Sequence, residues 1–313
     1  MRLTLDAKTS LPRDAGSATL VGRAWLPGGK HPGPSVVAVR AGQVFDITSA
    51  APTMTELVNA SDPVKLARTE KGARKIGPVA ALLKNSVPDG RDETRPWLLA
   101  PCDLQAVKAA GVTFASSMLE RVIESKAKGD PCLQETLRAE LTREIGADLS
   151  KVKPGSAAAE KLKAALVARD LWSPYLEVGI GPYAEIFTKT APMASVGTGA
   201  EIGLHPESSW NNPEPEIVLA VNARGQTVGA TLGNDVNLRD FEGRSALLLG
   251  KAKDNNASSA IGPFIRLFDK GYGIADVRKS VVSLTVAGAA GFTMERSSSM
   301  ALITPDPLHL VRN

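Results

Sequence analysis

The chain has 313 residues, enough for one large or two moderate domains with a substantial core. Its 37 Lys and Arg against 33 Asp and Glu leave a formal charge of only +4, spread without a basic block, which argues against a nucleic-acid partner. The uncharged apolar runs are far shorter than the ~20 residues of a membrane span, and the first residues lack a signal-peptide core. Cys102 and Cys132 fit no metal-binding spacing, so the composition predicts a cytoplasmic protein without a membrane partner.

Residues 18–47 have the composition of β-strands. The runs ATLVGRAWLP and PSVVAVRAGQVFDIT are rich in β-branched residues, and Ala41-Gly42 stands where a hairpin turn would lie. The polar stretch PDGRDETRPW is typical of a connector. The sequence therefore predicts a small β-rich domain over residues 1–95 and a second domain over residues 96–313.

Helical spacing of apolar residues dominates from about residue 114 to residue 171. It recurs in FASSMLERVIESKAKG, PCLQETLRAELTREIG and AAEKLKAALVARDLW, with alternating charges at the other positions. These charges are typical of solvated helix faces and indicate no function. We expect a helical region inserted into the second domain.

Short β-rich runs separated by Gly, Pro, Asn and Asp follow from Pro182 onward. This pattern predicts a curved antiparallel sheet or an open barrel. The segment from Asn222 to Gly225 has the residues of a hairpin turn between IVLAV and TVGATLG. The two runs are therefore expected to pair as antiparallel neighbours.

Two glutamates, Glu214 and Glu216, stand at the start of the apolar run in NNPEPEIVLAV. Residues two apart in a strand share a face, so both carboxylates are expected on one side. Charges and prolines at this place are also typical of an edge strand that resists aggregation. Asp235, however, is nearly as far from the turn at Arg224 as Glu214 is, which predicts that it lies opposite the glutamates.

Three clustered carboxylates would repel one another and raise one another's pKa unless a cation neutralises them. Oxygen ligands alone suit a hard divalent cation, first Mg²⁺, with Mn²⁺ or Ca²⁺ as alternatives. Zinc is disfavoured because His31, His205 and His309 all lie outside the cluster. Downstream, Lys253 fits an ordinary surface lysine as well as a base whose pKa a nearby cation lowers.

Four segments of the second half of the chain form a recognisable series. In chain order they are EIFTKTAPMASVGTGAEIGL, the Glu214 and Glu216 pair, GNDVNLRDFEG and AKDNNASSAIGPF. Their order and spacing resemble the fumarylacetoacetate hydrolase superfamily over roughly residues 100–270. The resemblance implies an α+β, mainly β fold, in which a mixed β-sheet roll or open barrel carries the small N-terminal domain and the helical insertion. It also implies a homo-oligomer, a dimer or tetramer, and a C-terminal part shorter than in relatives.

Within this superfamily the segments SSWNNPEPE and NDVNLRDFEGRSALLLGKAKDNNAS resemble the branch that dehydrates 2-keto-3-deoxy-pentonates. That resemblance implies that Glu214, Glu216 and Asp235 bind Mg²⁺. It implies that Lys253 is catalytic, as the base or as a partner of the substrate carboxylate. It also implies a set of residues that contact the substrate: Thr113, Phe114, Ser116, Ser117, Arg239 and Ser258.

The expected reaction is the conversion of a 2-keto-3-deoxy-pentonate, of the D-xylonate or D-arabinonate type, to 2-oxoglutarate semialdehyde. Residues 111–120, GVTFASSMLE, lack the histidine with which the hydrolases activate water, which favours elimination over hydrolysis. Two alternatives stay open: a metal-dependent hydrolase or decarboxylase of a 2-oxo or 1,3-diketo acid, and a truncated homologue without catalysis, since the sequence ends at Asn313.

Overall fold

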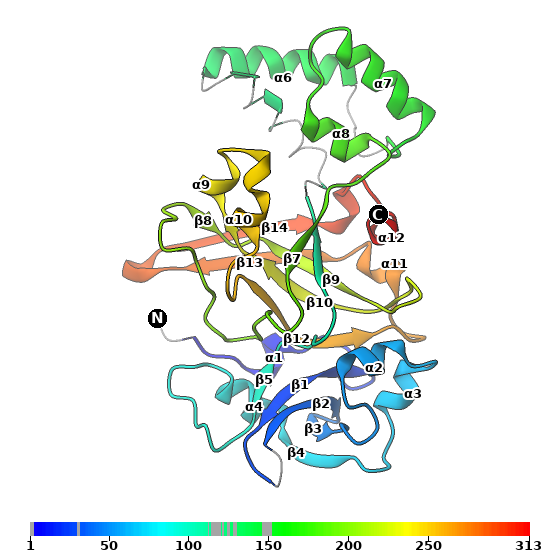
Figure 1. Cartoon of the computed structure of the whole chain (residues 1–313), viewed down its shortest axis with the longest axis vertical. Coiled ribbons are helices and arrows are strands. Elements are labelled where there is room, and N and C mark those ends of the chain that lie inside the picture. The colour runs from blue at the N-terminus through cyan, green and yellow to red at the C-terminus, as the bar shows by residue number, and fades with distance from the viewer. Residues whose placement is uncertain are drawn as a thin grey trace. The chain divides into compact units, whose positions relative to one another are not determined.

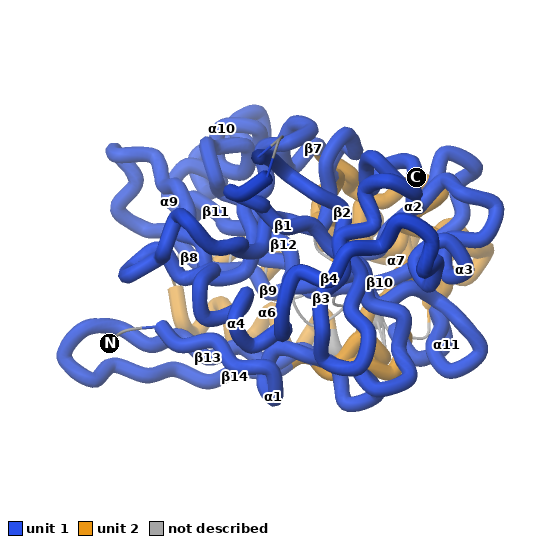
Figure 2. Tube along the Cα trace, turned by 90° about the horizontal axis from the view of Figure 1, so that it is seen from below, with its two compact units in different colours: residues 1–107, 188–277, 282–297 blue, residues 108–187, 278–281, 298–313 orange. Residues whose placement is uncertain are grey.

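The computed structural model describes residues 3–29, 32–111, 113, 120, 122, 123, 126, 127, 130–145 and 152–313. The chain forms two compact units (Figure 2). The first comprises residues 1–107, 188–277 and 282–297, and the second residues 108–187, 278–281 and 298–313. Over the described residues, every helix is too short or too polar to cross a bilayer.

An eight-stranded antiparallel sheet forms the centre of the first unit (Figure 1). Its strands are β1 (Leu20–Leu26), β2 (Gly33–Arg40), β3 (Gln43–Asp46), β4 (Arg74–Pro78), β5 (Trp97–Leu99), β9 (Pro215–Val221), β10 (Thr227–Asp235) and β12 (Ser259–Leu267). They follow the order β4-β3-β2-β1-β12-β10-β9, with β5 paired to β1. Strands β4 and β9 are the two ends of this path through the described residues, so the sheet is not a closed barrel.

The remaining strands form three two-stranded ladders: β6 (Val107–Ala110) with β7 (Ile186–Thr190), β8 (Asn211–Asn212) with β11 (Asn237–Leu238), and β13 (Val281–Ala287) with β14 (Thr293–Ser299). The helices of the first unit are short: α1 (Ala7–Ser10), α2 (Met54–Asn59), α3 (Pro63–Ala67), α4 (Val79–Asn85), α9 (Arg239–Glu242), η2 (Ala246–Leu248), α10 (Leu249–Lys253), α11 (Ile274–Val277) and η3 (Ala289–Gly291). The predicted α+β class with a large antiparallel sheet is confirmed, and the roll shape stays a prediction.

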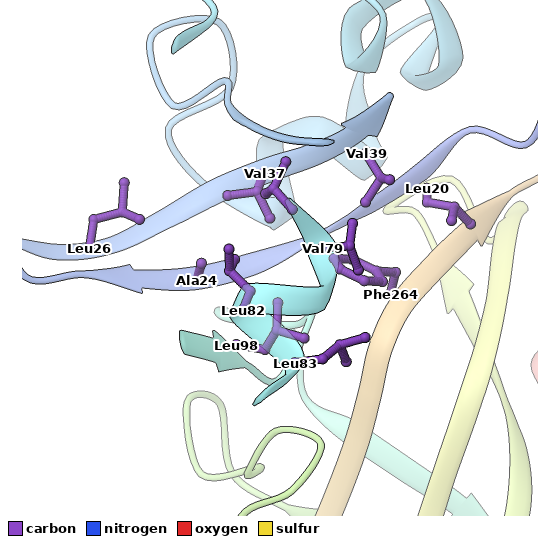
Figure 3. Packing of buried hydrophobic residues seen from close by; sticks show 11 residues of the cluster. Leu20, Ala24, Leu26, Val37, Val39, Val79, Leu82, Leu83, Leu98 and Phe264 are labelled. Carbon is purple, nitrogen blue, oxygen red and sulfur yellow. The ribbon is translucent and has the colours of Figure 1, made fainter. Parts of the chain in front are cut away.

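The two faces of β1 and β2 bury different hydrophobic clusters because alternate side chains of a strand point to opposite faces. On one face Leu20 and Val37 pack with Leu82 and Leu83 of α4 and with Phe264 of β12 (Figure 3). The second cluster combines the other face of β1 and β2 with residues of α2 and α3. Helices therefore cover both faces of this part of the sheet.

Both predicted hairpin turns are present. Between β2 and β3, Ala41 and Gly42 both have positive φ, 45° and 71°, the conformation of the two-residue turns whose twist matches a hairpin. Between β9 and β10, the Asn222 N–H donates to the Gln226 carbonyl at 2.9 Å. The Asn222 side chain accepts from two backbone N–H groups of the same turn, those of Arg224 and Gln226. This local bonding fixes the β9–β10 register.

The second unit is mainly helical. It holds α6 (Pro131–Ile145), α7 (Ala157–Val167), α8 (Pro174–Ile180), η4 (Met300–Leu302) and α12 (Pro307–Arg312). Leu141, Leu166 and Leu176 are buried together in its core. The predicted helices within residues 131–146 and 158–172 are confirmed, whereas most of residues 114–129 lies outside the described residues.

The predicted domain boundary near residue 95 stays a prediction. The structure pairs β1, from before that point, with β12, from far beyond it, through Leu20 opposite Arg266 and Val21 opposite Ile265. One continuous sheet therefore connects the N-terminal strands with the hairpin that carries Glu216 and Asp235.

Candidate metal centre

The β9–β10 hairpin brings Glu214, Glu216 and Asp235 together. In its register Gly233 lies opposite Glu216, and the Asp235 N–H donates to the Glu214 carbonyl at 2.9 Å. Because opposite residues share a face and the period is two, all three carboxylates project to the same side. One oxygen atom from each lies within 4.8 Å of the other two. The predicted cluster is thus present, and its role as a ligand set stays a prediction.

A closely packed glycine lies beside this cluster. A Cβ atom added to Gly233 would lie 2.5 Å from Val218 Cγ2, a distance that side chains do not tolerate. Gly233 also lies directly opposite Glu216, between the two acidic ends of the hairpin. A side chain there would require the Val218 side chain beside it to move.

Two buried lysines contact the acidic cluster. Lys253, at the end of α10 and 4% exposed, donates to Asp235 Oδ2 at 3.1 Å and to Glu214 Oε2. Lys189, in β7 and 1% exposed, donates to the Val236 carbonyl at 2.8 Å and to the Lys253 carbonyl. Its Nζ also lies 2.9 Å from Asp235 Oδ1. Asp235 is therefore held between two cations, and Lys189 fixes the end of the helix that carries Lys253.

The pKa values of the two lysines move in opposite directions. Burial lowers the pKa of Lys253, but the charges of Glu214 and Asp235 outweigh it, so the pKa lies above its ordinary value. Burial also lowers the pKa of Lys189, and here the attraction of Asp235 is too weak to reverse the shift. Lys253 is consequently an ammonium group at neutral pH in this arrangement.

Glu216 has a strongly raised carboxyl pKa. Burial, followed by repulsion from Asp235 and Glu214, raises the pKa of Glu216 from 4.5 to about 8. At neutral pH Glu216 is therefore mainly protonated, and the Lys253 ammonium group lies beside Glu214 and Asp235. A divalent cation among these oxygens would compete directly with that proton.

The donor set fits a hard divalent cation. All three side chains offer carboxylate oxygens, the ligands that Mg²⁺, Mn²⁺ and Ca²⁺ share. Asp235 Oδ1 is buried and, although near Lys189, accepts no hydrogen bond of normal geometry from the described residues. Three carboxyl groups whose oxygens lie within 4.8 Å of one another repel, and a bound cation would compensate that repulsion.

An amide and a fourth carboxylate lie behind Glu214. Asn237, fully buried, donates through Nδ2 to Glu214 Oε1 at 3.1 Å and to Glu242 Oε2 at 2.8 Å. Glu242 Oε2 also accepts from Arg239 at 2.7 Å. Sequence reasoning assigned no role to Lys189, Asn237 or Glu242. For Lys189 a signal existed, since it is a single lysine within the β-rich run EIFTK.

The residues predicted to contact substrate have different surroundings. Arg239 pairs with Glu242 and lies over the ring of Trp210, 5.9 Å from its centroid. Ser258 is 1% exposed, and its hydroxyl donates to the Lys253 carbonyl at 2.9 Å. Thr113 belongs to the second unit, where its carbonyl accepts from the Thr304 N–H. The three other predicted contacts, Phe114, Ser116 and Ser117, lie outside the described residues.

Two curated proteins are similar to the chain in sequence. A probable 2-keto-3-deoxyxylonate dehydratase of Haloferax volcanii is 38% identical over 91 residues, 29% of this chain and 31% of that protein. A 2-dehydro-3-deoxy-D-arabinonate dehydratase of Saccharolobus solfataricus is 36% identical over 86 residues, 28% and 29% of the two chains. The matches therefore span less than a third of each relative. No family model matches the chain.

Solved structures share the fold at low identity. A 2-keto-3-deoxyarabinonate dehydratase superposes with a TM-score of 0.57 and 16% identity over 94% of this chain and 81% of that chain. A 2-keto-3-deoxy-D-arabinonate dehydratase complexed with magnesium and 2,5-dioxopentanoate gives a TM-score of 0.55 and 18% identity, with the same coverage. A fumarylacetoacetate hydrolase of Exiguobacterium antarcticum gives 0.53 and 15%, covering 94% and 80%. The resemblance predicted from the four sequence segments is confirmed by these relatives.

Proposed function

We propose that this chain, which resembles the dehydratases of the fumarylacetoacetate hydrolase superfamily, is a divalent-cation-dependent hydro-lyase acting on a 2-keto-3-deoxy-pentonate. The observation that carries the proposal is the convergence of Glu214, Glu216 and Asp235 within 4.8 Å beside buried Lys253. The two similar curated proteins bear the names of dehydratases of such sugar acids. The proposed product is 2-oxoglutarate semialdehyde, formed with loss of one water.

The three carboxylates would hold the cation, with Mg²⁺ the proposed ion. Support comes from the donor set and from a protein of the same fold that was solved with magnesium and 2,5-dioxopentanoate, another name for this semialdehyde. A cation held there would supply Lewis-acid stabilisation of the negative charge that develops on the 2-keto oxygen. Mn²⁺ and Ca²⁺, which take the same oxygen ligands, are the alternatives.

Proton transfer is the proposed task of Lys253. In the reaction the C3–H bond breaks, its electron pair forms the C3–C4 double bond, and the C4 hydroxyl leaves as water after taking up a proton. Transfer of one hydrogen from C5 to C3 then moves the double bond to C4–C5, and this enol tautomerises to the aldehyde as its hydroxyl hydrogen passes to C4. Lys253 carries its proton in the arrangement described above, so it is able to protonate the leaving hydroxyl directly. It can take the C3 proton only after releasing its own.

Lys189 and Ser258 are proposed to position Lys253 rather than to react. Lys189 is buried and donates to the Lys253 carbonyl, and the Ser258 hydroxyl donates to the same oxygen. These contacts fix the last residue of α10 without using the ammonium group of Lys253. The backbone of Lys253 is thereby held in place before a substrate binds.

Product analysis tests the proposed reaction against its rivals. The protein is incubated with 2-keto-3-deoxy-D-xylonate or its L-isomer, and the products are separated by mass spectrometry. Dehydration gives a five-carbon semialdehyde that is one water lighter than the substrate. Pyruvate and a two-carbon fragment would instead indicate carbon–carbon cleavage, and carbon dioxide would indicate decarboxylation; either result would replace the dehydratase assignment.

A further inference from the structure

Asn237 lies between two carboxylates and contacts both with one amide nitrogen. Its Nδ2 is 3.1 Å from Glu214 Oε1 and 2.8 Å from Glu242 Oε2, and the side chain is fully buried. An amide nitrogen has two N–H donors, and ionised carboxylates only accept. The contacts therefore fix the amide orientation, because the flipped amide would place an oxygen against two anions.

The outer carboxylate is itself held in place. Glu242 Oε2 accepts from Arg239 Nη1 at 2.7 Å as well as from Asn237. Its side chain is 26% exposed and that of Arg239 is 21% exposed, so this pair is partly shielded from solvent. Burial raises the pKa of Glu242, but its hydrogen bonds to Asn237 and Arg239 outweigh this and leave the pKa below its ordinary value. Glu242 is thus an anion that holds Asn237 from behind.

The arrangement is poorly explained by stability alone. Asn237 Oδ1 is buried and has no hydrogen-bond partner among the described residues, which costs free energy of folding. Its Nδ2, in contrast, makes both of its possible bonds, and one of them fixes the orientation of Glu214. Glu214 presents its other oxygen, Oε2, to Lys253 at the centre of the cluster.

We infer that Asn237 is a positioning residue of the cation site: anchored by Glu242 and Arg239, it holds Glu214 Oε1 and thereby aims Glu214 Oε2 at the cation. The inference rests on the cation site of the proposed function. Hydrogen bonds from outside the ligand set orient the ligands of many metal sites, and their loss typically weakens metal binding ~10- to 100-fold.

The variant Asn237→Ala tests this inference, with Mn²⁺ as the probe. The dissociation constant of Mn²⁺ is measured by electron paramagnetic resonance on the purified full chain. We expect the constant to rise at least about 10-fold. Asn212→Ala is the matched control, since Asn212 is the partner of Asn237 in the β8–β11 ladder and its Nδ2 is 3.5 Å from the same Glu214 oxygen. Because that contact is at the limit of hydrogen bonding, we expect a change of about twofold or less.

Two variants of Glu242 test the anchor. Glu242→Gln keeps a side-chain oxygen that can accept from Asn237, so it should retain most of the Mn²⁺ affinity. Glu242→Leu removes the acceptor and should approach the effect of Asn237→Ala. If Asn237→Ala does not fold, Asn237→Ser takes its place. A serine hydroxyl has a single donor and can bind only one of the two carboxylates, so this variant should give an intermediate Mn²⁺ dissociation constant.

Unchanged Mn²⁺ binding by folded Asn237→Ala would overturn the inference, even if that variant unfolds at a lower temperature, because a structural role predicts only the second effect. Wild-type protein that binds Mn²⁺ but forms no semialdehyde would contradict the proposed reaction and leave the role of Asn237 standing. Wild-type protein without Mn²⁺ binding would overturn both.

Discussion

Glu216 gives the acidic cluster a pH dependence that can be measured without substrate. In the unfolded chain this carboxyl loses its proton near its ordinary pKa of 4.5, whereas in the folded chain it keeps the proton up to about pH 8. Between these values the unfolded state binds fewer protons, so the contribution of Glu216 to the free energy of unfolding falls as pH rises from 4.5 to 8. Above pH 8 this contribution is constant.

Urea unfolding in EDTA at several pH values tests this prediction, with Glu216→Gln as the control. The free energy of wild type minus that of the variant should decline between pH 5 and pH 8, because Gln does not titrate. A difference that stays constant or increases with pH would contradict a raised pKa of Glu216 in the folded protein.

Lys253 is predicted to act through its proton as well as its charge. Lys253→Arg keeps a cation beside Glu214 and Asp235, but a guanidinium group does not give up its proton in this pH range. If proton transfer is needed, turnover should fall ~10²–10⁴-fold in Lys253→Arg, while the folded structure persists. Lys253→Met should lose turnover and also stability, since it leaves two carboxylates without this partner.

Steady-state rates distinguish a role of Lys253 in proton transfer from a role through its charge alone. Circular dichroism checks that each variant is folded. Lys253→Arg with at least a third of wild-type turnover would limit Lys253 to electrostatic binding. Full turnover in Lys253→Met would remove it from the mechanism altogether.

Single residues of the site differed in how far the sequence could predict them. Asp235 could be placed opposite Glu214 because both flank one hairpin, whose turn fixes the register. Lys189 reaches Asp235 from β7, a strand outside that hairpin, so no local pattern specifies the contact. Asn237 and Glu242 meet only because the chain turns from β11 into α9, a bend that spacing does not reveal.

At the level of elements, the β9–β10 hairpin depends on close packing against β12. A Cβ atom added to Gly229 of β10 would lie 2.7 Å from Ile265 Cγ2 and 2.8 Å from the Arg266 carbonyl oxygen. Backbone cannot move aside cheaply, so we expect Gly229→Ala to lower the free energy of unfolding by about 1–3 kcal/mol. To relieve this clash β10 should move away from β12, and cation binding at Asp235 should become weaker.

Gly77→Ala is the control for this prediction, because Gly77 also lies in a strand, β4, and a Cβ atom added there would meet nothing within 4 Å. Its free energy of unfolding should stay within about 0.5 kcal/mol of wild type. Equal stability of the two variants in urea would contradict the packing described for β10 and β12.

The elements themselves were largely predictable, whereas their long-range pairing was not. The hairpins at Ala41-Gly42 and at Asn222–Gly225 have turn residues whose backbone preferences specify the fold locally. The pairing of β1 with β12 joins residues about 245 positions apart, as Leu20 with Arg266 shows. Hydrophobic alternation predicts which face of each strand is buried, but it leaves open which strand lies beside it.

At the scale of the whole molecule, the residues of the proposed cation site all lie within one compact unit. Glu214, Glu216, Asp235, Lys189 and Lys253 all belong to the first unit, whose sheet includes the N-terminal strands. The helical core of α6, α7 and α8 belongs to the second unit. Cation binding by these residues and substrate selection through Thr113 and its neighbours both stay predictions.

The most direct test of the central claim is the Mg²⁺ dependence of semialdehyde formation from 2-keto-3-deoxy-D-xylonate, followed in wild type and in Glu214→Gln and Glu216→Gln. We predict that wild-type turnover is lost in EDTA and restored by Mg²⁺, and that neither variant is restored at the same Mg²⁺ concentration. Turnover that persists in EDTA, or variants as active as wild type, would contradict the assignment of these carboxylates as the ligands of a catalytic cation.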